Sequence, residues 1–253
     1  IINIKFIYQN DLKDKQMNVL ILVRHGQSIW NLEKKFTGWV DVDLNENGIQ
    51  EAKKAGELIK KKNINIDIYY SSFQLRAKKT LNIIQKILKD HKNSKIAWEL
   101  NERHYGALTG LNKEEMKKKL GEKKVHQIRR SWDLRPEPLD KSNSYHPINI
   151  ETYKNIPIDK IPDTESLEDT YYRVINFYKR EIEKISKSNN ILISAHGNSL
   201  RSLCKYLFKL DNTKISKLEI PTGNPLFIEF DEDNNISNCE YLDPERAEDL
   251  LVY

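Results

Sequence analysis

The chain has 253 residues, of which 38% are hydrophobic and 31% charged, the balance of a globular domain with a sizeable core. A net charge of +5 could suggest a nucleic-acid partner, but the 42 basic and 37 acidic residues are scattered along the chain, so we expect none. There are only two cysteines, no apolar run near the roughly 20 residues that span a bilayer and no signal-peptide core, so we expect a cytoplasmic protein without a membrane partner.

Strand and helix patterns alternate along the chain, which predicts an α/β fold. The elements expected first are a strand at 19–23, a short helix capped by Ser28, a helix at 45–62, a strand at 67–70, a helix at 75–88 and a strand near 95–98. Those expected next are two helices across 113–133, a helix at 166–186, a strand at 191–195 and a β-pair of 226–230 with 239–242. Residues 134–163 hold most of the prolines and little periodicity, which is typical of a functional lid or wall.

The element order predicts a mostly parallel central sheet with helices on both faces. No linker or repeat divides the chain, so we expect a single catalytic domain over residues 17–253. Residues 1–16 precede Met17 and the first strand, and we expect them to be either a disordered extension or the result of an over-long start assignment. The sequence leaves the oligomeric state open, a homo-oligomer included.

Two histidines follow buried strands. His25 stands in Arg24-His25-Gly26 after the first strand, and His196-Gly197 follows the strand at 191–195. Since ligands of open α/β sheets bind beyond the carboxyl ends of the strands, the two histidines are expected to face each other across one crevice. An arginine and helix N-termini beside a histidine make an anion site with a nucleophile inside it. The pattern therefore predicts phosphoryl transfer through a phosphohistidine.

Further motifs accompany the two histidines. They are Ser28, Trp30 and Asn31, FTGW at 36–39, LNERHYGAL at 100–108, GLNK at 110–113, RRSWD at 129–133, AHGNSLR at 195–201 and IPTGNPL at 220–226. Together these motifs resemble those of the cofactor-dependent phosphoglycerate mutases, the 2,3-bisphosphoglycerate-using branch of the histidine phosphatase superfamily. The resemblance runs from about Asn18 to about Asp243. It implies a phosphoglycerate mutase-like fold and a glycolytic and gluconeogenic isomerase that interconverts 3-phosphoglycerate and 2-phosphoglycerate, with 2,3-bisphosphoglycerate as cofactor.

The resemblance also assigns the catalytic residues. It implies that His25 is the residue phosphorylated, and the ordinary histidine pKa near 6.5 makes the nucleophilic neutral ring available at pH 7. Arg24 and Arg76 would clamp the oxygens of the transferring group, because a guanidinium gives bidentate hydrogen bonds. His196 would stabilise the developing charge. Glu102 matches the acid/base position that moves the proton of the substrate hydroxyl.

Other positions match contacts to a small phosphorylated three-carbon acid. Lys113, Arg129 and Arg130 would hold the carboxylate and the non-transferring phosphate at the far end, and Tyr105 would add a hydroxyl. The remaining matches are Asn31, Thr37 and Gly38 on the near side, with the backbone N–H groups of Gly197 and Asn198 at a helix start. Because these groups supply the neutralisation, we expect no metal ion, and the chain has neither an HExxH motif nor paired-cysteine ligand spacing.

The sequence leaves three alternative functions to consider besides that of a mutase. A phosphatase, in which water attacks the phosphohistidine, is disfavoured because it need not hold a far carboxylate and phosphate as Lys113, Arg129 and Arg130 would. A bisphosphoglycerate synthase is disfavoured by Ser28 and by Thr37-Gly38, which resemble the mutase pattern. A catalytically silent scaffold is disfavoured because the whole catalytic set is intact.

Some residues depart from the family pattern. Gln27 stands where glutamate is common, Thr109 where glutamine is usual, and Trp132 where tyrosine is frequent and is expected simply to pack. Family members usually continue into a Lys- and Gly-containing tail that covers the substrate, whereas this sequence stops at Tyr253. We therefore expect a larger phosphatase leak than in tailed relatives.

The remaining histidines have weaker contexts. His91 and His126 lie in lysine-rich stretches and are expected to be solvated. His104 is expected to have a structural role and to hold the backbone around Glu102. His146 has no role that the sequence assigns.

Overall fold

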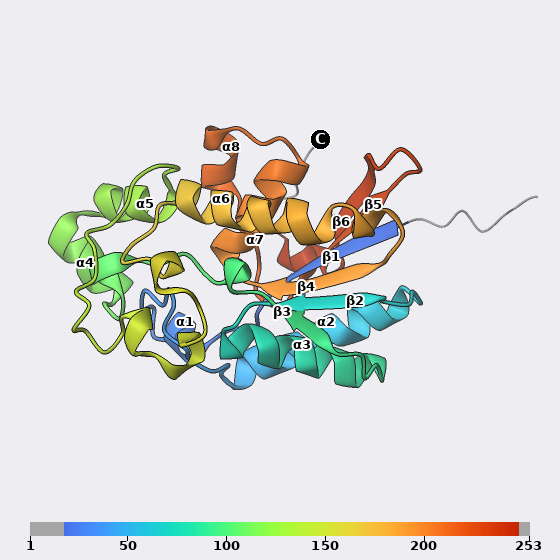
Figure 1. The fold of residues 1–253 in the computed structure, drawn as a ribbon, viewed down its shortest axis with the longest axis horizontal. Helices are drawn as coiled ribbons and strands as arrows, with labels where there is room; N and C mark the ends of the chain where they lie inside the picture. Colours follow the sequence, from blue (N-terminus) through green and yellow to red (C-terminus); the bar gives the residue numbers. More distant parts are fainter. Residues whose placement is uncertain (1–17, 248–253) are drawn as a thin grey trace, which may run out of the picture.

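The computed structural model describes residues 18–247, and a six-stranded sheet lies at its centre (Figure 1). The expected extension at 1–16 lies outside the described residues, as does the C-terminal end on which the expected phosphatase leak rests. The strands are β1 (Asn18–Arg24), β2 (Ile68–Ser71), β3 (Ser94–Ile96), β4 (Ile191–Ala195), β5 (Pro225–Phe230) and β6 (Ile236–Tyr241). The helices are α1 (Ile29–Leu32), α2 (Glu46–Lys61), α3 (Leu75–Leu88), α4 (Lys113–Leu120), α5 (Glu122–Arg130), α6 (Leu167–Phe177), α7 (Gly197–Leu207) and α8 (Asn212–Lys217). None of the helices between residues 18 and 247 has both the length and the hydropathy of a membrane span.

The strands lie in the order β3-β2-β4-β1-β5-β6. Neighbouring strands from β3 to β1 run parallel, whereas β5 is antiparallel to both β1 and β6. The mostly parallel sheet expected from the sequence is therefore confirmed. Arg24 at the end of β1 lies opposite Ala195 at the end of β4, so the chain leaves these two strands side by side.

Apolar clusters cover both faces of the sheet. Leu20 and Leu22 of β1 belong to a cluster with α6 and α7, whereas Ile21 belongs to a cluster with α2 and α3. Figure 1 shows α6 and α7 on one side of the sheet and α2 and α3 on the other, as predicted. Helices and apolar side chains block both faces of the sheet. A ligand can therefore reach the central strands only at their ends.

Three elements differ from the expected pattern. The single helix expected at 166–186 ends at Phe177 and continues as a π-helical turn, Tyr178–Ile182, and a later 3-10 turn, Ile185–Lys187. Helix α8 was not expected, and β6 begins at Ile236 rather than 239. β6 is an edge strand whose side chains are mostly exposed or half-buried, so no apolar alternation marks its start.

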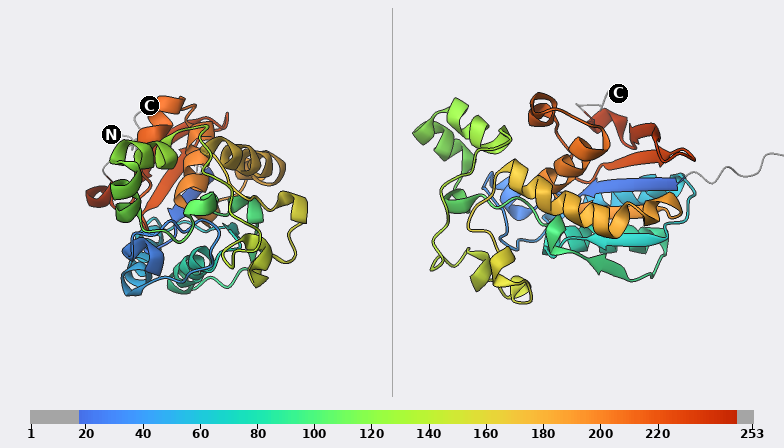
Figure 2. Two further views of the ribbon diagram at one scale, coloured as in Figure 1. Left: turned by 90° about the vertical axis from the view of Figure 1, so that its left-hand side faces the viewer. Right: turned by 45° about the horizontal axis from the view of Figure 1, so that its top comes forward.

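Residues 134–163 form the long irregular excursion expected from their composition, and their expected role as a functional lid or wall stays a prediction. The segment contains 3-10 turns at Pro147–Asn149, Glu151–Tyr153 and Ile158–Lys160. The Tyr153 hydroxyl donates to the Trp39 carbonyl at 2.5 Å, which fixes the segment to the FTGW loop. Figure 2 shows the segment together with α4 and α5 beyond the carboxyl ends of the central strands.

Candidate active site

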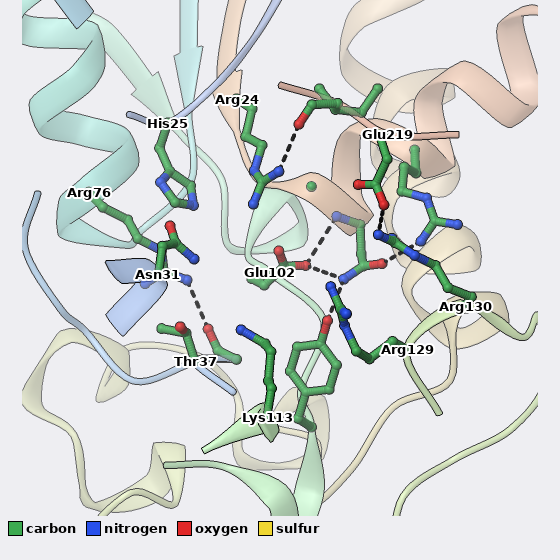
Figure 3. Close-up of a pocket in the computed structure, with 16 residues that line it drawn as sticks. Arg24, His25, Asn31, Thr37, Arg76, Glu102, Lys113, Arg129, Arg130 and Glu219 are labelled. Carbon is green, nitrogen blue, oxygen red and sulfur yellow. Dashed lines mark hydrogen bonds and ion pairs between the residues drawn. The ribbon is translucent and has the colours of Figure 1, made fainter. Parts of the chain in front are cut away.

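A cavity of about 110 Å³ lies where the chain leaves β1 and β4 (Figure 3). Every site residue expected from the sequence lines it, except His196. The lining residues are Arg24, His25, Asn31, Thr37, Gly38, Arg76, Glu102, Tyr105, Lys113, Arg129, Arg130, Gly197, Asn198, Arg201, Glu219 and Ile220. Six of these side chains are cationic and two are carboxylates, so the cavity suits a small ligand with several negative charges.

A tight turn positions His25 at the end of β1. The His25 N–H donates to the Ala195 carbonyl at 2.9 Å, so the ladder between β1 and β4 continues up to the histidine. The next residue must be glycine, because a Cβ on Gly26 would lie 2.1 Å from the carbonyl oxygen of Gly48 in α2. The Gly26 N–H also donates to the Thr80 hydroxyl at 3.0 Å. These contacts fix the backbone that carries the imidazole.

The hydrogen bonding of His25 selects one tautomer. Its Nδ1 lies 2.7 Å from the Gly26 carbonyl oxygen, which only accepts, so Nδ1 carries the proton. Burial, followed by the charges of Arg76 and Arg24, lowers the pKa of His25 well below the ordinary histidine value. The ring is therefore neutral at pH 7, and Nε2 offers an unprotonated lone pair.

His196 stands against His25 behind the cavity. The two ring centroids are 4.9 Å apart and the planes are tilted by 57°. Nε2 of His196 lies 2.7 Å from the Ser72 hydroxyl, while its Nδ1 has no hydrogen-bond partner among the described residues. Burial, then the charges of Arg76 and His25, lowers the pKa of His196 well below the ordinary value. The predicted pairing of the two histidines is thus present, with both rings neutral.

Arg24 and Arg76 are held by backbone carbonyls. Arg24 Nη1 donates to the Ile220 carbonyl at 2.7 Å, and its Nε has no partner within residues 18–247. Arg76 donates to the carbonyls of Val40 and Gly38, both at 2.9 Å. Neither guanidinium is paired directly with a carboxylate in these contacts, so both charges remain available to an anionic ligand beside His25.

One carboxylate oxygen of Glu102 is held in place by hydrogen bonds. Its Oε1 accepts from the Arg103 N–H at 2.7 Å and from the side-chain amide of Asn198 at 2.9 Å. The backbone N–H of Asn198 also donates to this oxygen, at 3.2 Å, so the phosphate contact expected of this N–H stays a prediction. Gly197 lies beside the other oxygen, since a Cβ there would be 3.7 Å from Oε2. The carboxylate is thus oriented through one oxygen, and its other oxygen lies beside Gly197.

Basic side chains line the far side of the cavity. Lys113 begins α4, and its Nζ donates to the Lys35 carbonyl at 2.6 Å. Burial, then the charge of Arg129, lowers the pKa of Lys113 to about 8. Arg129 and Arg130 end α5, and Arg130 forms an ion pair with Glu219.

Helix α1 and the loop that carries Thr37 and Gly38 supply the near side. Asn31 is held by a capping box at the start of α1, in which its Oδ1 accepts from the Ser28 N–H and the Ser28 hydroxyl accepts from the Asn31 N–H, both at 3.1 Å. Thr37 is buried, and its hydroxyl has no hydrogen-bond partner in the described part of the chain. Gly38 has φ of +54°, in the left-handed region that favours glycine. Of these groups, the Thr37 hydroxyl is the unsatisfied one among the described residues, and all three residues line the same cavity as His25.

Sequence reasoning missed four residues of this region. Arg201 lies within the AHGNSLR motif and donates to the Asn198 side chain at 3.0 Å, so the motif itself could have indicated it. Ile220 begins the IPTG motif, and its carbonyl holds Arg24. Ser72 and Glu219 had no such signal, because a serine before a helix and a carboxylate on a loop are common surface features.

The other histidines are mostly structural or solvated. His104 is buried and its Nδ1 accepts from the Gly106 N–H at 2.9 Å, so it holds the backbone at Gly106 rather than next to Glu102. His146 is buried and lies 3.0 Å from Asp163 within the 134–163 segment. As expected, His91 and His126 are exposed.

Comparison with known sequences shows the family of the chain. Residues 20–149 and 139–239 match the histidine phosphatase superfamily (branch 1). A curated protein of Pelagibacter ubique (strain HTCC1062), named 2,3-bisphosphoglycerate-dependent phosphoglycerate mutase, is 65% identical over 238 residues, which cover 94% of this chain and 100% of that protein. The chain belongs to the 2,3-bisphosphoglycerate-dependent phosphoglycerate mutase family.

More distant members of this family are found in other bacteria. The mutase of Borreliella burgdorferi (strain ZS7) is 48% identical and covers 90% of this chain and 93% of its own length. That of Caulobacter sp. (strain K31) is 46% identical, with coverage of 92% and 98%. Among solved structures, a mycobacterial glucosyl-3-phosphoglycerate phosphatase has a TM-score of 0.64 at 18% identity and covers 88% of this chain and 96% of its own. That likeness shows the shared fold alone.

Proposed function

We propose that the protein interconverts 3-phosphoglycerate and 2-phosphoglycerate, a step of glycolysis and gluconeogenesis, by way of a phosphohistidine at His25. The family membership supports the reaction. The observation in the structure that carries it is the state of His25, a neutral ring with an unprotonated Nε2 beside a cavity lined by cations. The partners on this proposal are phosphorylated three-carbon acids, and the site of action is the cytoplasm, where such acids are converted.

Phosphoryl transfer to the enzyme forms a bond between phosphorus and Nε2 of His25 as the donor oxygen leaves. Arg24 and Arg76 neutralise the oxygens of the transferring group, because both guanidinium groups lie beside His25 without a directly paired carboxylate. His196 and the Gly197 N–H stabilise the charge that develops in the transition state. The neutral state of His196 limits repulsion of the cationic ring that forms as His25 attacks.

The return transfer needs a base for the substrate hydroxyl. Glu102 takes this proton as the hydroxyl oxygen attacks phosphorus and the bond to His25 breaks. Its Oε1 is held by Asn198 and Arg103, which leaves Oε2 for the proton. Transfer to one hydroxyl of the acid and from the other releases the isomer, so no net phosphate is consumed.

The residues present fit 2,3-bisphosphoglycerate. Thr37 Oγ1 and Arg24 Nε are buried polar atoms that have no hydrogen-bond partner among residues 18–247. Unsatisfied donors of this kind are expected in a site that binds an anion. Arg24 and Arg76 would hold one phosphate, and Lys113 with Arg129 would hold groups at the other end. When bound, the cofactor supplies the phosphoryl group that first loads His25.

A labelling and turnover experiment tests this function. Conversion of 3-phosphoglycerate can be followed by ³¹P NMR with and without added 2,3-bisphosphoglycerate, and we expect the cofactor to stimulate it. His25→Ala should abolish both turnover and acid-labile phosphate on the protein, since no neighbouring side chain replaces the nucleophile. The control His91→Ala alters an exposed histidine and should leave both unchanged. Normal labelling of His25→Ala would disprove the mechanism.

A further inference from the structure

Glu219 is a carboxylate in a cavity whose charged side chains are mostly cations, and the proposed reaction gives it no task. Its side chain forms an ion pair with the Arg130 guanidinium (Figure 3). It lines both this cavity and a neighbouring hollow that also includes Thr222, Glu245 and Arg246. A carboxylate in this place competes with an anionic ligand for the same guanidinium.

The backbone next to Glu219 is fixed while its side chain has room to move. Arg24 Nη1 donates to the Ile220 carbonyl at 2.7 Å, and the Gly223 N–H donates to the Arg24 carbonyl at 2.9 Å. Leu218 and Ile220 are buried on either side. The Glu219 side chain, in contrast, is 47% exposed. The carboxylate can therefore leave Arg130 for solvent without a change in the backbone.

Arg130 needs a counter-ion when no ligand is bound. Its side chain is only 15% exposed, and burial together with the charge of Arg129 lowers the pKa of Arg130 to about 10. A buried guanidinium without a partner is unfavourable. Glu102 does not act as the counter-ion of Arg130, because its Oε1 is held by Asn198 and Arg103. Glu219 is the carboxylate that the fold places on Arg130.

We propose that Glu219 is an internal anion that occupies Arg130 until the carboxylate or the non-transferring phosphate of the ligand displaces it. The inference rests on the proposed function, since that function assigns Arg130 to the substrate. Each binding event exchanges one charge-assisted contact for another, so Glu219 lowers the affinity for ligand and speeds release. Repulsion grows with ligand charge, so 2,3-bisphosphoglycerate is affected more than a monophosphoglycerate. Glu219 is thus a specificity-determining residue, and it takes no part in bond making.

Steady-state kinetics of Glu219→Gln tests the inference. Removal of the competing charge should lower the KM for 3-phosphoglycerate and the activating concentration of 2,3-bisphosphoglycerate by roughly two- to fivefold, the range expected of a partly exposed ion pair. The decrease should be larger for the bisphosphate, and kcat should not rise. Glu245→Gln is the matched control, because Glu245 is exposed, lines the neighbouring hollow and carries the same charge. Equal or weaker binding by Glu219→Gln would overturn the inference.

A double-mutant comparison separates competition at Arg130 from a general effect of charge. In an Arg130→Gln background, Glu219→Gln should give no further gain in affinity, since the guanidinium that it frees is absent. A gain that persists in this background would overturn the proposed competition, because the carboxylate would then act at a distance.

The failure of this inference is distinguishable from failure of the proposed function. A wild-type protein without cofactor-stimulated isomerisation contradicts the function. An active wild type with an unaltered Glu219→Gln variant contradicts the Glu219 inference alone. The rise in Tm on addition of 2,3-bisphosphoglycerate requires no turnover and tests Glu219 in both cases, with a larger rise expected for Glu219→Gln.

Discussion

At the scale of single residues, Glu102 offers the sharpest test of the proton route. Glu102→Gln keeps the shape of the side chain and one acceptor oxygen for the amide of Asn198, but it cannot accept a proton. We expect kcat to fall by roughly 10² to 10⁴, the usual share of general acid–base catalysis. The KM should stay level or decrease, because a negative charge leaves an anion site. Steady-state rates measure both constants, and an unchanged kcat with a raised KM would assign Glu102 to substrate positioning.

The residues of the site differ in how far the sequence could predict them. His25, Arg24 and Glu102 stand in motifs whose neighbours limit their geometry, so the motifs alone brought them to one cavity. Glu219 could not be predicted in this way, because its meaning depends on Arg130, which is distant in sequence. The hydrogen bond from the Asn198 N–H to Glu102 could not be predicted either, since the sequence does not show which acceptor lies nearest.

At the scale of elements, α2 supports the turn that carries the nucleophile. Gly48→Ala would favour an isolated helix by up to about 1 kcal/mol. In this fold a Cβ on Gly48 would lie 2.1 Å from the Gln27 carbonyl oxygen, so the segment after His25 must shift. We therefore expect the free energy of unfolding to decrease by about 2–3 kcal/mol, as in overpacked cores, and kcat to fall.

Urea unfolding and steady-state rates test the Gly48 prediction, with Lys53→Ala as the control. Lys53 is exposed on the same helix, and its loss should change the unfolding free energy by less than about 0.5 kcal/mol. A Gly48→Ala protein as stable and active as wild type would show that the turn is more tolerant than the contact implies.

Elements were predictable where a periodic apolar face exists. Helix α3 was expected at the residues where it lies, because one face is buried against the sheet. The π-helical turn at Tyr178–Ile182 could not be expected, since the apolar pattern of the helix continues through it. The start of β6 lacked any pattern because an edge strand is only partly buried.

At the scale of the whole molecule, buried neutral histidines make stability depend on pH. Burial, then the charge of His146, lowers the pKa of His104 to about 3. The unfolded chain takes up this proton near pH 6.5, so the stabilisation is complete above pH 6.5 and is lost as pH falls toward 3. At pH 5 the loss from His104 is about 2 kcal/mol, and the lowered pKa values of His25 and His196 act in the same direction.

The unfolding free energy in urea should therefore decrease from pH 7 to pH 5, and His104→Asn should reduce that decrease. Asparagine cannot take up a proton but keeps an acceptor for the Gly106 N–H. An exposed variant, His126→Asn, should leave the pH dependence as in wild type. If His104→Asn shows the full decrease, His104 is protonated in the folded state at pH 5 and the prediction is wrong.

The sheet illustrates what the sequence could predict of the whole. Alternating patterns were sufficient for a mostly parallel sheet covered on both faces, because they report local periodicity. The order β3-β2-β4-β1-β5-β6 depends on which buried strands pair, and apolar strands are too alike for their sequences to specify partners.

The place of β1 in that order has a consequence for synthesis on the ribosome. β1 precedes the other described strands in the chain, yet both of its partners, β4 and β5, lie at residues 191–230. A nascent chain must therefore carry an apolar, unpaired strand until residues 191–230 have been translated, and contacts this distant in sequence form slowly. Chains released before β4 emerges would contain His25 but lack both strands that pair with β1. We expect such chains to be unfolded substrates of chaperones and proteases, not folded enzymes with low activity.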